Sequence, residues 1–231
     1  MEKEFNIQVP MHLHGITLGQ YQEWLKIVDK FDEDKREDDE YLQVKMLQIF
    51  CKLPIEDTYK IPLTNFDSIV AHIGELFKAD TPLKHRWYME DDNERVELGL
   101  VPDLHKMSFG EYIDLETYIN KWEDMHKAMA VLFRPVTFQL KDAYNIADYK
   151  GTAKTAHIYK DMPLDIALGA INFLSRLTAK LLSHTLDSSH QMAKEQLEQA
   201  SKLTLEENGD GINHFILSLK RTQLESMKPL S

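Results

Sequence analysis

One short pattern occurs twice in this chain, and both times it predicts the start of a helix. Residues 16–21 read ITLGQY and residues 107–112 read MSFGEY, so the two copies lie 91 positions apart. In each copy a hydroxyl residue is followed three positions later by Gln or Glu, which is the spacing of a capping box. The two boxes are Thr17 with Gln20 and Ser108 with Glu111. Because such a box satisfies free N–H groups of the first turn, two similar helices are predicted.

The similarity extends to the residues before each helix. Apolar side chains alternate with other residues over 5–9 and again over 96–100. This alternation predicts a half-buried strand. A proline follows each segment, at Pro10 and Pro102, and ends the strand because it cannot donate a hydrogen bond to a ladder. A second helix is predicted after each first one, for example at about 39–52.

These patterns predict a duplicated architecture. We expect two related strand–helix–helix units at about 1–55 and 94–140, linked by residues 56–93. The units and the linker would form a core over residues 1–160, and residues 161–231 a helical C-terminal region. The predicted fold class is α+β, mainly α-helical, with a small sheet plus a helical C-terminal arm.

The remaining residues predict a few further elements. A helix capped by Thr64 is expected to end near Phe77. A β-hairpin is predicted at about 85–101, and alternating apolar residues predict a strand at 136–140. Residues 141–160 show no clear period and are expected to form an irregular loop.

Composition narrows the possible classes of function. The chain has 231 residues, a formal net charge of −11 and 43% hydrophobic residues, enough to build a substantial core. The acidic balance argues against sequence-specific or general nucleic-acid binding, which relies on Lys- and Arg-rich faces. With Cys51 as its single cysteine the chain forms no internal disulfide, and we expect a buried, unreactive side chain there.

The sequence gives no indication of a membrane or secretory role. The N-terminal residues MEKEFNIQV contain no apolar core of a signal peptide. No apolar run approaches the ~18 residues that a membrane-spanning helix needs. We therefore expect a soluble protein that is synthesised in the cytoplasm and does not bind membranes.

Three histidines are the best candidates for metal binding. His12 and His14 would lie on one face of a strand, and His105 occupies the position of His14 in the second copy. A zinc site needs at least a third protein ligand, and none follows at a recognisable spacing. We therefore predict no metal ion and no cofactor. The favoured alternative is surface or interface histidines beside a helix start.

No recognisable catalytic motif is present either. The sequence lacks the glycine-rich phosphate loop, the G-x-S-x-G of hydrolases and the H-E-x-x-H of zinc proteases. Carboxylates are numerous, but no pair stands out by spacing. The sequence therefore predicts a protein that is not an enzyme.

Apolar helical stripes are candidates for contact with another chain. Two methionines lie one turn apart in 125–133, and methionine adapts well to partner surfaces. A second stripe follows the long amphipathic helix predicted at about 164–186. Each stripe has a second possible role, packing within this chain. The interface candidates are Met125, Met129, Phe133, Leu168, Ile171, Leu174 and Phe215.

Three stretches of these helices resemble a known group of proteins. They are FGEYIDLETYI at 109–119, WEDMHKAMAVLFRPV at 122–136 and DMPLDIALGAI at 161–171. The pattern resembles small virion or tail-assembly proteins of tailed bacteriophages, of the crAss-like gut-phage type. The similarity covers about 5–25 and 96–175 and consists of packing residues, so it carries over no catalytic residue.

The resemblance implies a non-enzymatic role in a virus particle. The chain is expected to be a structural subunit of a neck or tail ring or collar, present in the virion and assembled in the host cytoplasm. Its partners would be copies of itself and other tail, neck or portal proteins. The alternative is a tail-assembly chaperone that is absent from the mature particle. Head-to-tail contacts between identical subunits suit the first role, because they close into rings when the rotation allows.

Overall fold

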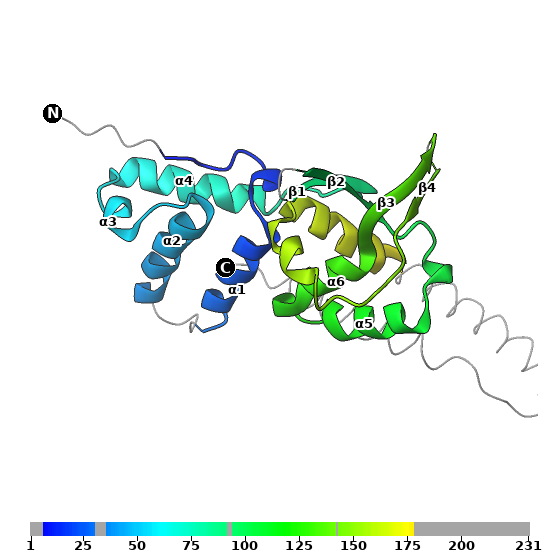
Figure 1. Ribbon diagram of the computed structural model, residues 1–231. Helices are drawn as coiled ribbons and strands as arrows, with labels where there is room; N and C mark the ends of the chain where they lie inside the picture. Colours follow the sequence, from blue (N-terminus) through cyan, green and yellow to red (C-terminus); the bar gives the residue numbers. More distant parts are fainter. Residues whose placement is uncertain (1–6, 31–35, 92–93, 142, 178–231) are drawn as a thin grey trace, which may run out of the picture.

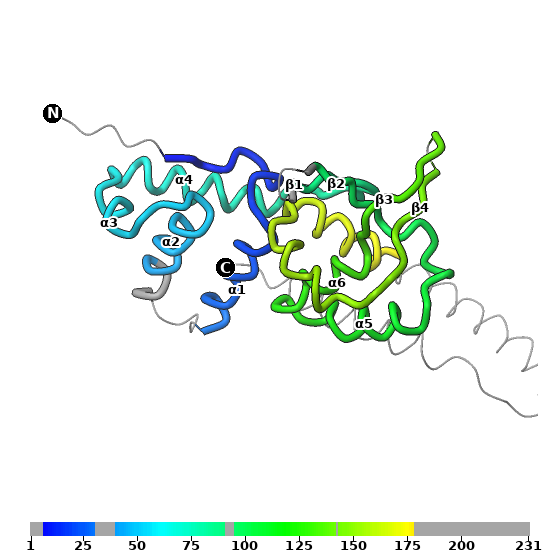
Figure 2. The backbone as a smooth tube through the Cα atoms, viewed as in Figure 1, coloured from blue at the N-terminus to red at the C-terminus, as the bar shows by residue number. Residues whose placement is uncertain are grey.

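The computed structural model describes residues 7–30, 36–91, 94–141 and 143–177 of the chain (Figure 1). Helices and one four-stranded antiparallel sheet make up this part. The predicted fold class, a mainly helical α+β protein, is therefore confirmed. Figure 2 follows the chain from a helical end, in blue and cyan, to a part that combines the sheet with further helices, in green and yellow.

The two predicted helix starts form matching structures. Short 3₁₀ helices, η1 (Leu13–Gly15) and η2 (Leu104–Lys106), precede α1 (Leu18–Val28) and α5 (Phe109–Ile119). The corresponding bounds all differ by the same 91 positions. Both capping boxes are complete, with hydrogen bonds in both directions between side chain and backbone. The two predicted helix starts are therefore confirmed.

A second helix follows each first one. α2 (Arg36–Phe50) packs on α1, and α6 (Met125–Leu132), preceded by η3 (Trp122–Asp124), packs on α5. After α2 the chain enters a loop at Cys51, whereas α6 leads directly into a strand. Cys51 is buried as expected, and burial raises the pKa of its thiol to about 11.

Two further helices connect the copies. α3 (Ile55–Thr58) is a single turn, and α4 (Leu63–Leu76) is the helix predicted to end near Phe77. The predicted cap at Thr64 is wrong, because Pro62 occupies the N-cap and Thr64 is the second helical residue. Proline fits a helix start, since its missing N–H would have no intrahelical partner there.

The strand predicted at 5–9 is not found in the described residues of that stretch. Residues 7–10 form no strand. Ile7 and Val9 pack half-buried against the core instead, and the Pro10 carbonyl lies 3.0 Å from Nε2 of His72 in α4. The prediction of a strand in the first unit is therefore wrong over these residues. Alternation over so few residues specifies a strand only where a partner strand supplies cross-strand contacts.

The sheet has the strand order β1–β2–β3–β4. β1 (Arg86–Asp91) and β2 (Glu94–Leu100) form the predicted hairpin, and β3 (Phe133–Leu140) contains the predicted strand. β3 pairs with β2 only at residues 133–135, and its outer half pairs with β4 (Ala143–Ile146). The outer half of β3 and β4 form a two-stranded hairpin whose tip projects from the body (Figure 1).

The interval 141–160 contains regular structure, so the prediction of an irregular loop is wrong at both of its ends. β4 lies near its beginning, and η4 (Ala156–Asp161), a 3₁₀ helix, lies near its end. Tyr144 anchors β4, because its hydroxyl donates to the Leu100 carbonyl (2.7 Å) and its ring covers Gly99. A strand this short has little periodic signal, and its pairing with β3 is what defines it.

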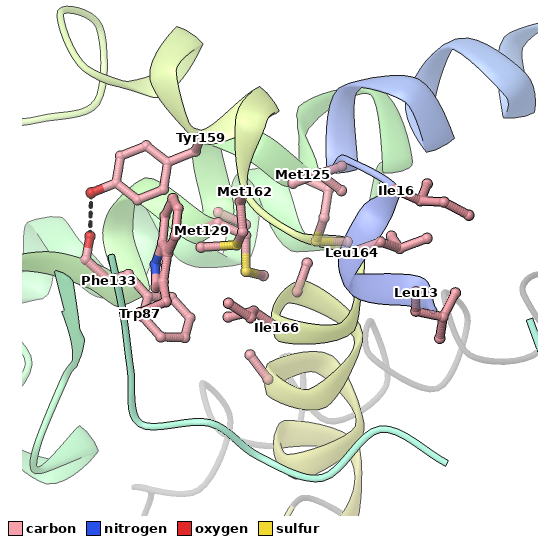
Figure 3. Close-up of a cluster of buried hydrophobic side chains, with 14 of the residues drawn as sticks. Leu13, Ile16, Trp87, Met125, Met129, Phe133, Tyr159, Met162, Leu164 and Ile166 are labelled. Atoms are coloured by element: carbon pink, nitrogen blue, oxygen red, sulfur yellow. Dashed lines mark hydrogen bonds between the residues drawn. The ribbon is translucent and has the colours of Figure 1, made fainter. Parts of the chain in front are cut away.

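One part of the core lies between α6, the sheet and the residues around Met162 (Figure 3), and the same core continues to α1, α2 and α4 through Trp24, Leu47 and Ile73. Trp87 of β1 faces Tyr159, whose hydroxyl donates to the Phe133 carbonyl. Residues 164–177 are helical and belong to the same core. The described beginning of the region 161–231 is thus continuous with the rest of the protein.

Candidate functional site

The three histidines considered as metal ligands lie at short helical turns. His12 is the N-cap of η1, and His14 lies within η1. His105 has the matching place in η2. All three side chains are exposed. Because residues 13–15 form a 3₁₀ helix, the strand geometry predicted for His12 and His14 does not form.

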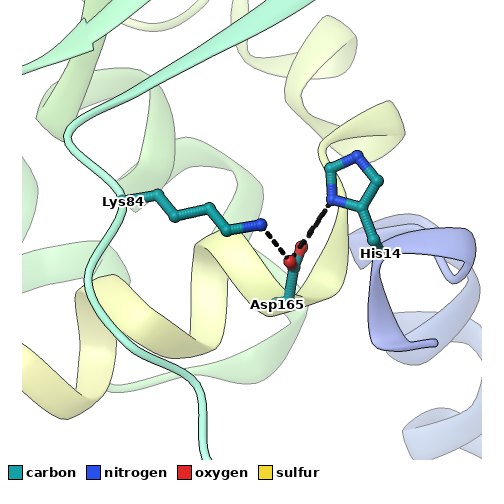
Figure 4. Close-up of polar contacts among 3 residues, drawn as sticks. All are labelled: His14, Lys84 and Asp165. Carbon is teal, nitrogen blue, oxygen red and sulfur yellow. Dashed lines mark hydrogen bonds and ion pairs between the residues drawn. The ribbon is translucent and has the colours of Figure 1, made fainter.

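His14 belongs to a charged cluster with Lys84 and Asp165 (Figure 4). Its Nδ1 atom lies 3.1 Å from Asp165 Oδ1, and Lys84 Nζ lies 2.6 Å from Asp165 Oδ2. The carboxylate is mostly buried, whereas both partners are largely exposed. Exposed ion pairs contribute about 0–1 kcal/mol each. The cluster joins η1, the segment before β1 and the helix at 164–177, so it holds three distant segments together.

The chemistry of this cluster is unlike that of a metal centre. Within the described residues, no group of three His, Cys, Asp or Glu side chains could hold a metal ion. The third member of the cluster is Lys84, whose ammonium group repels a cation. Among the described residues His105 joins no comparable cluster, and its backbone N–H donates to Asp103 Oδ1 (3.0 Å).

The methionine stripe lies in the core. Met125, Met129 and Phe133 are all 0% exposed. They therefore leave no surface for a partner, and core packing, the second of the two predicted roles, describes them correctly. The reason is that α6 packs against both α5 and η4.

The interface candidates of the last described helix differ among themselves. Leu174 is buried, whereas Leu168 and Ile171 are half-buried against the same core. At Gly169 the helix approaches the segment before β1 so closely that an added Cβ would lie 2.6 Å from the Pro82 carbonyl oxygen. Gly169 lies on another side of the helix, and Leu168, Ile171 and Leu174 themselves pack against the core of the protein. Phe215 lies outside the described residues.

A buried ion pair lies at the start of α5. Arg134 Nη2 of β3 lies 2.5 Å from Glu111 Oε1, and both side chains are nearly buried. The other oxygen of Glu111 accepts the Ser108 N–H of the capping box. Burial favours the neutral acid, but the hydrogen bonds from Ser108 and the charge of Arg134 outweigh it and lower the pKa of Glu111.

A tyrosine completes this polar group. The ring of Tyr149 lies 5.7 Å from Arg134 Cζ, and its hydroxyl donates to Asp114. Arg134 Nε is buried and has no hydrogen-bond partner among the described residues. The capping box was predictable from spacing. The ion pair between its Glu111 and Arg134 was not, because these two residues lie 23 positions apart on different elements.

Two groups of exposed apolar side chains lie on the half of the protein that contains the sheet. The hairpin surface consists of Phe138 and Leu140 of β3, which are 58% and 64% exposed. The α5 surface consists of Phe109 and Ile113, which are 79% and 41% exposed. The two side chains of each pair lie on the same face. Residues two positions apart share a face of a strand, and residues four positions apart share a face of a helix.

A third group lies at the helical end of the molecule. This junction surface, between α3 and the start of α4, consists of Ile55, Tyr59 and Leu63. The three groups account for most of the large exposed apolar side chains of the described residues. Groups of this kind mark interaction sites more often than single exposed residues do.

Sequence reasoning missed these surfaces because it looked for one apolar stripe per helix. In α5 the buried apolar side chains are Leu115 and Ile119, while Phe109 and Ile113 follow a second stripe. A helix with two apolar stripes has more apolar surface than one neighbour covers. That signal was available in the sequence at 109–119.

Comparisons with known proteins add no assignment. No protein-family profile, curated protein sequence or solved structure matches the chain. Among the described helices, none combines the length and the apolar character required to cross a bilayer. The functional argument therefore rests on the surfaces and contacts described above.

Proposed function

We propose that this protein is a non-enzymatic structural subunit of a tailed-phage virion, within a neck or tail ring or collar. The observation that carries the proposal is the hairpin of β3 and β4, which is fixed at its base and apolar and exposed at its tip. The packing residues of the chain also resemble those of virion and tail-assembly proteins of tailed phages, which supports a role in a virus particle. Its role is to contact copies of itself and other virion proteins.

The base of the hairpin is rigid. Tyr144 donates a hydrogen bond to the Leu100 carbonyl, and its ring fills the space above Gly99. Arg86 stacks on the same ring, with its Cζ atom 5.7 Å from the ring centre, and pairs with Glu97. A rigid base lowers the entropy cost of binding, because the hairpin is already ordered before it meets a partner.

The tip of the hairpin offers apolar area to a partner. Residues 137–140 are all exposed, although two of them are Phe138 and Leu140. Fully burying a Phe or Leu side chain contributes about 1.5–3 kcal/mol. Within the described part of the chain β4 is also an edge strand, and the backbone groups of its outer edge can hydrogen-bond to a strand of a neighbour. A protein–protein contact satisfies both features at once.

Quantitative mass spectrometry of purified particles tests the proposed role. Peptides of this chain should be present in the particles, at a fixed multiple of a component of known copy number. Abundance in the crude lysate with none in the particles would contradict the structural role and favour an assembly chaperone.

A pair of variants tests the hairpin itself. Phe138→Asp should reduce incorporation into particles, because it places a charge on the apolar face of the tip. Gln139→Asp is the matched control, since it adds the same charge one position away on the opposite face. Equal incorporation of the two variants would contradict a role for the hairpin surface.

A further inference from the structure

The two copies of the helix start differ in what covers them. At α1 an extended segment, residues 162–164, lies across the cap. The Leu18 N–H donates to the Met162 carbonyl and the Leu164 N–H donates to the Ile16 carbonyl, both at 2.8 Å. Thr17 and Pro163 face each other in an antiparallel bridge. Leu18, the first helical residue, is completely buried under this segment.

The matching place at α5 is uncovered. Phe109 stands where Leu18 stands in the first copy and is 79% exposed. Among the described residues, the Phe109 N–H and the Met107 carbonyl take part in no backbone hydrogen bond of the kind formed at α1. With Ile113 one turn further on, this site has the same cap and a comparable apolar side chain, but no segment of the described residues covers it.

The covering segment at α1 has a distinctive form. It is an apolar residue, a proline and a leucine, and the leucine is the first residue of the helix at 164–177. The start of α4 repeats this form as Ile61, Pro62 and Leu63, with Pro62 as N-cap and Leu63 as the first helical residue. Leu63 is 73% exposed.

The backbone groups of this second segment are available as well. Among the described residues, the Ile61 carbonyl and the Leu63 N–H form no backbone hydrogen bond. These are the groups that correspond to the Met162 carbonyl and the Leu164 N–H in the contact at α1. The start of α4 thus offers an N–H donor, a carbonyl acceptor and an apolar side chain. These could serve as partners for the carbonyl, the N–H and the apolar side chain at the start of α5.

The two sites cannot meet within one chain. Figure 1 shows the start of α4 at the helical end of the molecule and α5 at the opposite end, below the sheet. Figure 2 shows the same separation along the backbone. Complementary surfaces at opposite ends of one chain favour head-to-tail association of copies.

We propose that the segment Ile61–Leu63 of one copy docks on the start of α5 of a second copy. Pro62 would face the partner's Ser108, as Pro163 faces Thr17 within the chain. Leu63 and Tyr59 would cover Phe109 and Ile113 of the partner. The inference rests on the proposed function, because it supplies the contact between identical subunits that a ring requires.

Two charge substitutions in the full-length protein test this contact by sedimentation and light scattering. Leu63→Asp and Phe109→Asp each remove one half of it and should weaken self-association at least about tenfold. Both positions are exposed first residues of helices, where an acidic side chain favours the helix dipole, so both variants should fold. Gln139→Asp, an exposed position outside both surfaces, is the control with an unchanged self-association.

Mixing the two variants is the decisive step. Each retains the half that the other lacks, so an equimolar mixture should form heterodimers that grow no further. The proposal is overturned if the unmodified protein stays monomeric at its highest soluble concentration. It is also overturned if either variant associates normally, or if the mixture stays monomeric. Absence of the protein from particles would refute the virion role but leave these solution results unchanged.

Discussion

The starts of α1 and α5 have the same capping box and very different surroundings. At α1 the third helical residue is Gln20, whose amide also donates to the Ile49 carbonyl at 2.5 Å. At α5 it is Glu111, whose carboxylate pairs with Arg134. The comparison shows that a local hydrogen-bond pattern can start two helices without determining which neighbours they acquire.

The first helical residues make the contrast sharper. Leu18 is completely buried beneath residues 162–164, whereas Phe109 is exposed. The larger side chain therefore faces solvent and the smaller one lies in the core. Burial here follows from what the rest of the chain places above each helix, and not from the hydrophobicity of the residue.

Alanine at these two positions should give the largest difference between the copies. Leu18→Ala should lower the free energy of unfolding by about 3 kcal/mol, because it removes buried apolar contacts and leaves a cavity. Phe109→Ala should change it by less than about 0.5 kcal/mol, since that side chain is exposed. Urea denaturation of both variants measures the two values, and similar losses would show that the α5 surface is covered within the monomer.

Neutralising the third residue of α5 should have the next largest effect. Glu111→Gln keeps a hydrogen-bonding side chain but leaves Arg134 without its counter-charge. We expect a loss of about 2 kcal/mol, the range for hydrogen bonds to charged groups. Gln20→Ala is the comparison at α1, where no buried charge is involved and a loss of about 1 kcal/mol is expected. A smaller loss for Glu111→Gln than for Gln20→Ala would contradict the importance of the ion pair.

The effect of Glu111→Gln should depend on pH. The pKa of Glu111 in the folded protein lies below its ordinary value of 4.5. The stabilisation is therefore fully present above pH 4.5 and is lost as the pH falls through the lower folded-state pKa. The free energies of unfolding of the unmodified protein and of Glu111→Gln should thus converge in acid. A constant difference down to the acid transition would contradict this assignment.

The caps themselves should contribute nearly equally. Thr17→Ala and Ser108→Ala each remove one hydrogen bond to a helical N–H and should each cost about 1 kcal/mol. Serine at 17 and threonine at 108 should restore stability, because both hydroxyls can cap. Thermal unfolding of the four variants provides the values, and markedly unequal losses on alanine substitution would show that one cap depends on its surroundings.

The histidines before the two helices should show the smallest effect. His14→Ala removes one partner of Asp165 and should cost at most about 0.5 kcal/mol, because the imidazole is largely exposed and Lys84 remains. His105→Ala should cost less still, since its contact to Asp103 uses the backbone N–H. Calorimetry under matched conditions checks this order, and the reverse order would contradict the role of the cluster.

Elements with strong local signals were predictable. The helices after Thr17 and Ser108, the hairpin near 85–101 and the strand at 136–140 all form. The failures involve short or partner-dependent segments. The segment at 5–9 alternates as a strand does, yet its described residues pack against the core, and the four-residue β4 exists through its pairing with β3.

The candidate site was less predictable than the fold. The methionine stripe correctly identified apolar residues at helical spacing, but periodicity does not distinguish a core face from a partner face. Met125 and Met129 are in the core, while Phe109 and Leu63, which sequence analysis did not select, are exposed. The pairing of His14 with Asp165 joins residues 151 positions apart, which no local pattern encodes.

The sequence by itself determined where the helices of the repeat begin, because a capping box is complete within four residues. It also determined that the fold is mainly helical and has a substantial core, since both follow from periodicity and composition. Only the tertiary structure decided that the start of α1 is covered by residues 162–164, whereas no described residue covers the start of α5 in the same way. The physical reason is range: capping bonds join neighbours in the chain, whereas burial depends on segments that folding brings together from far along it.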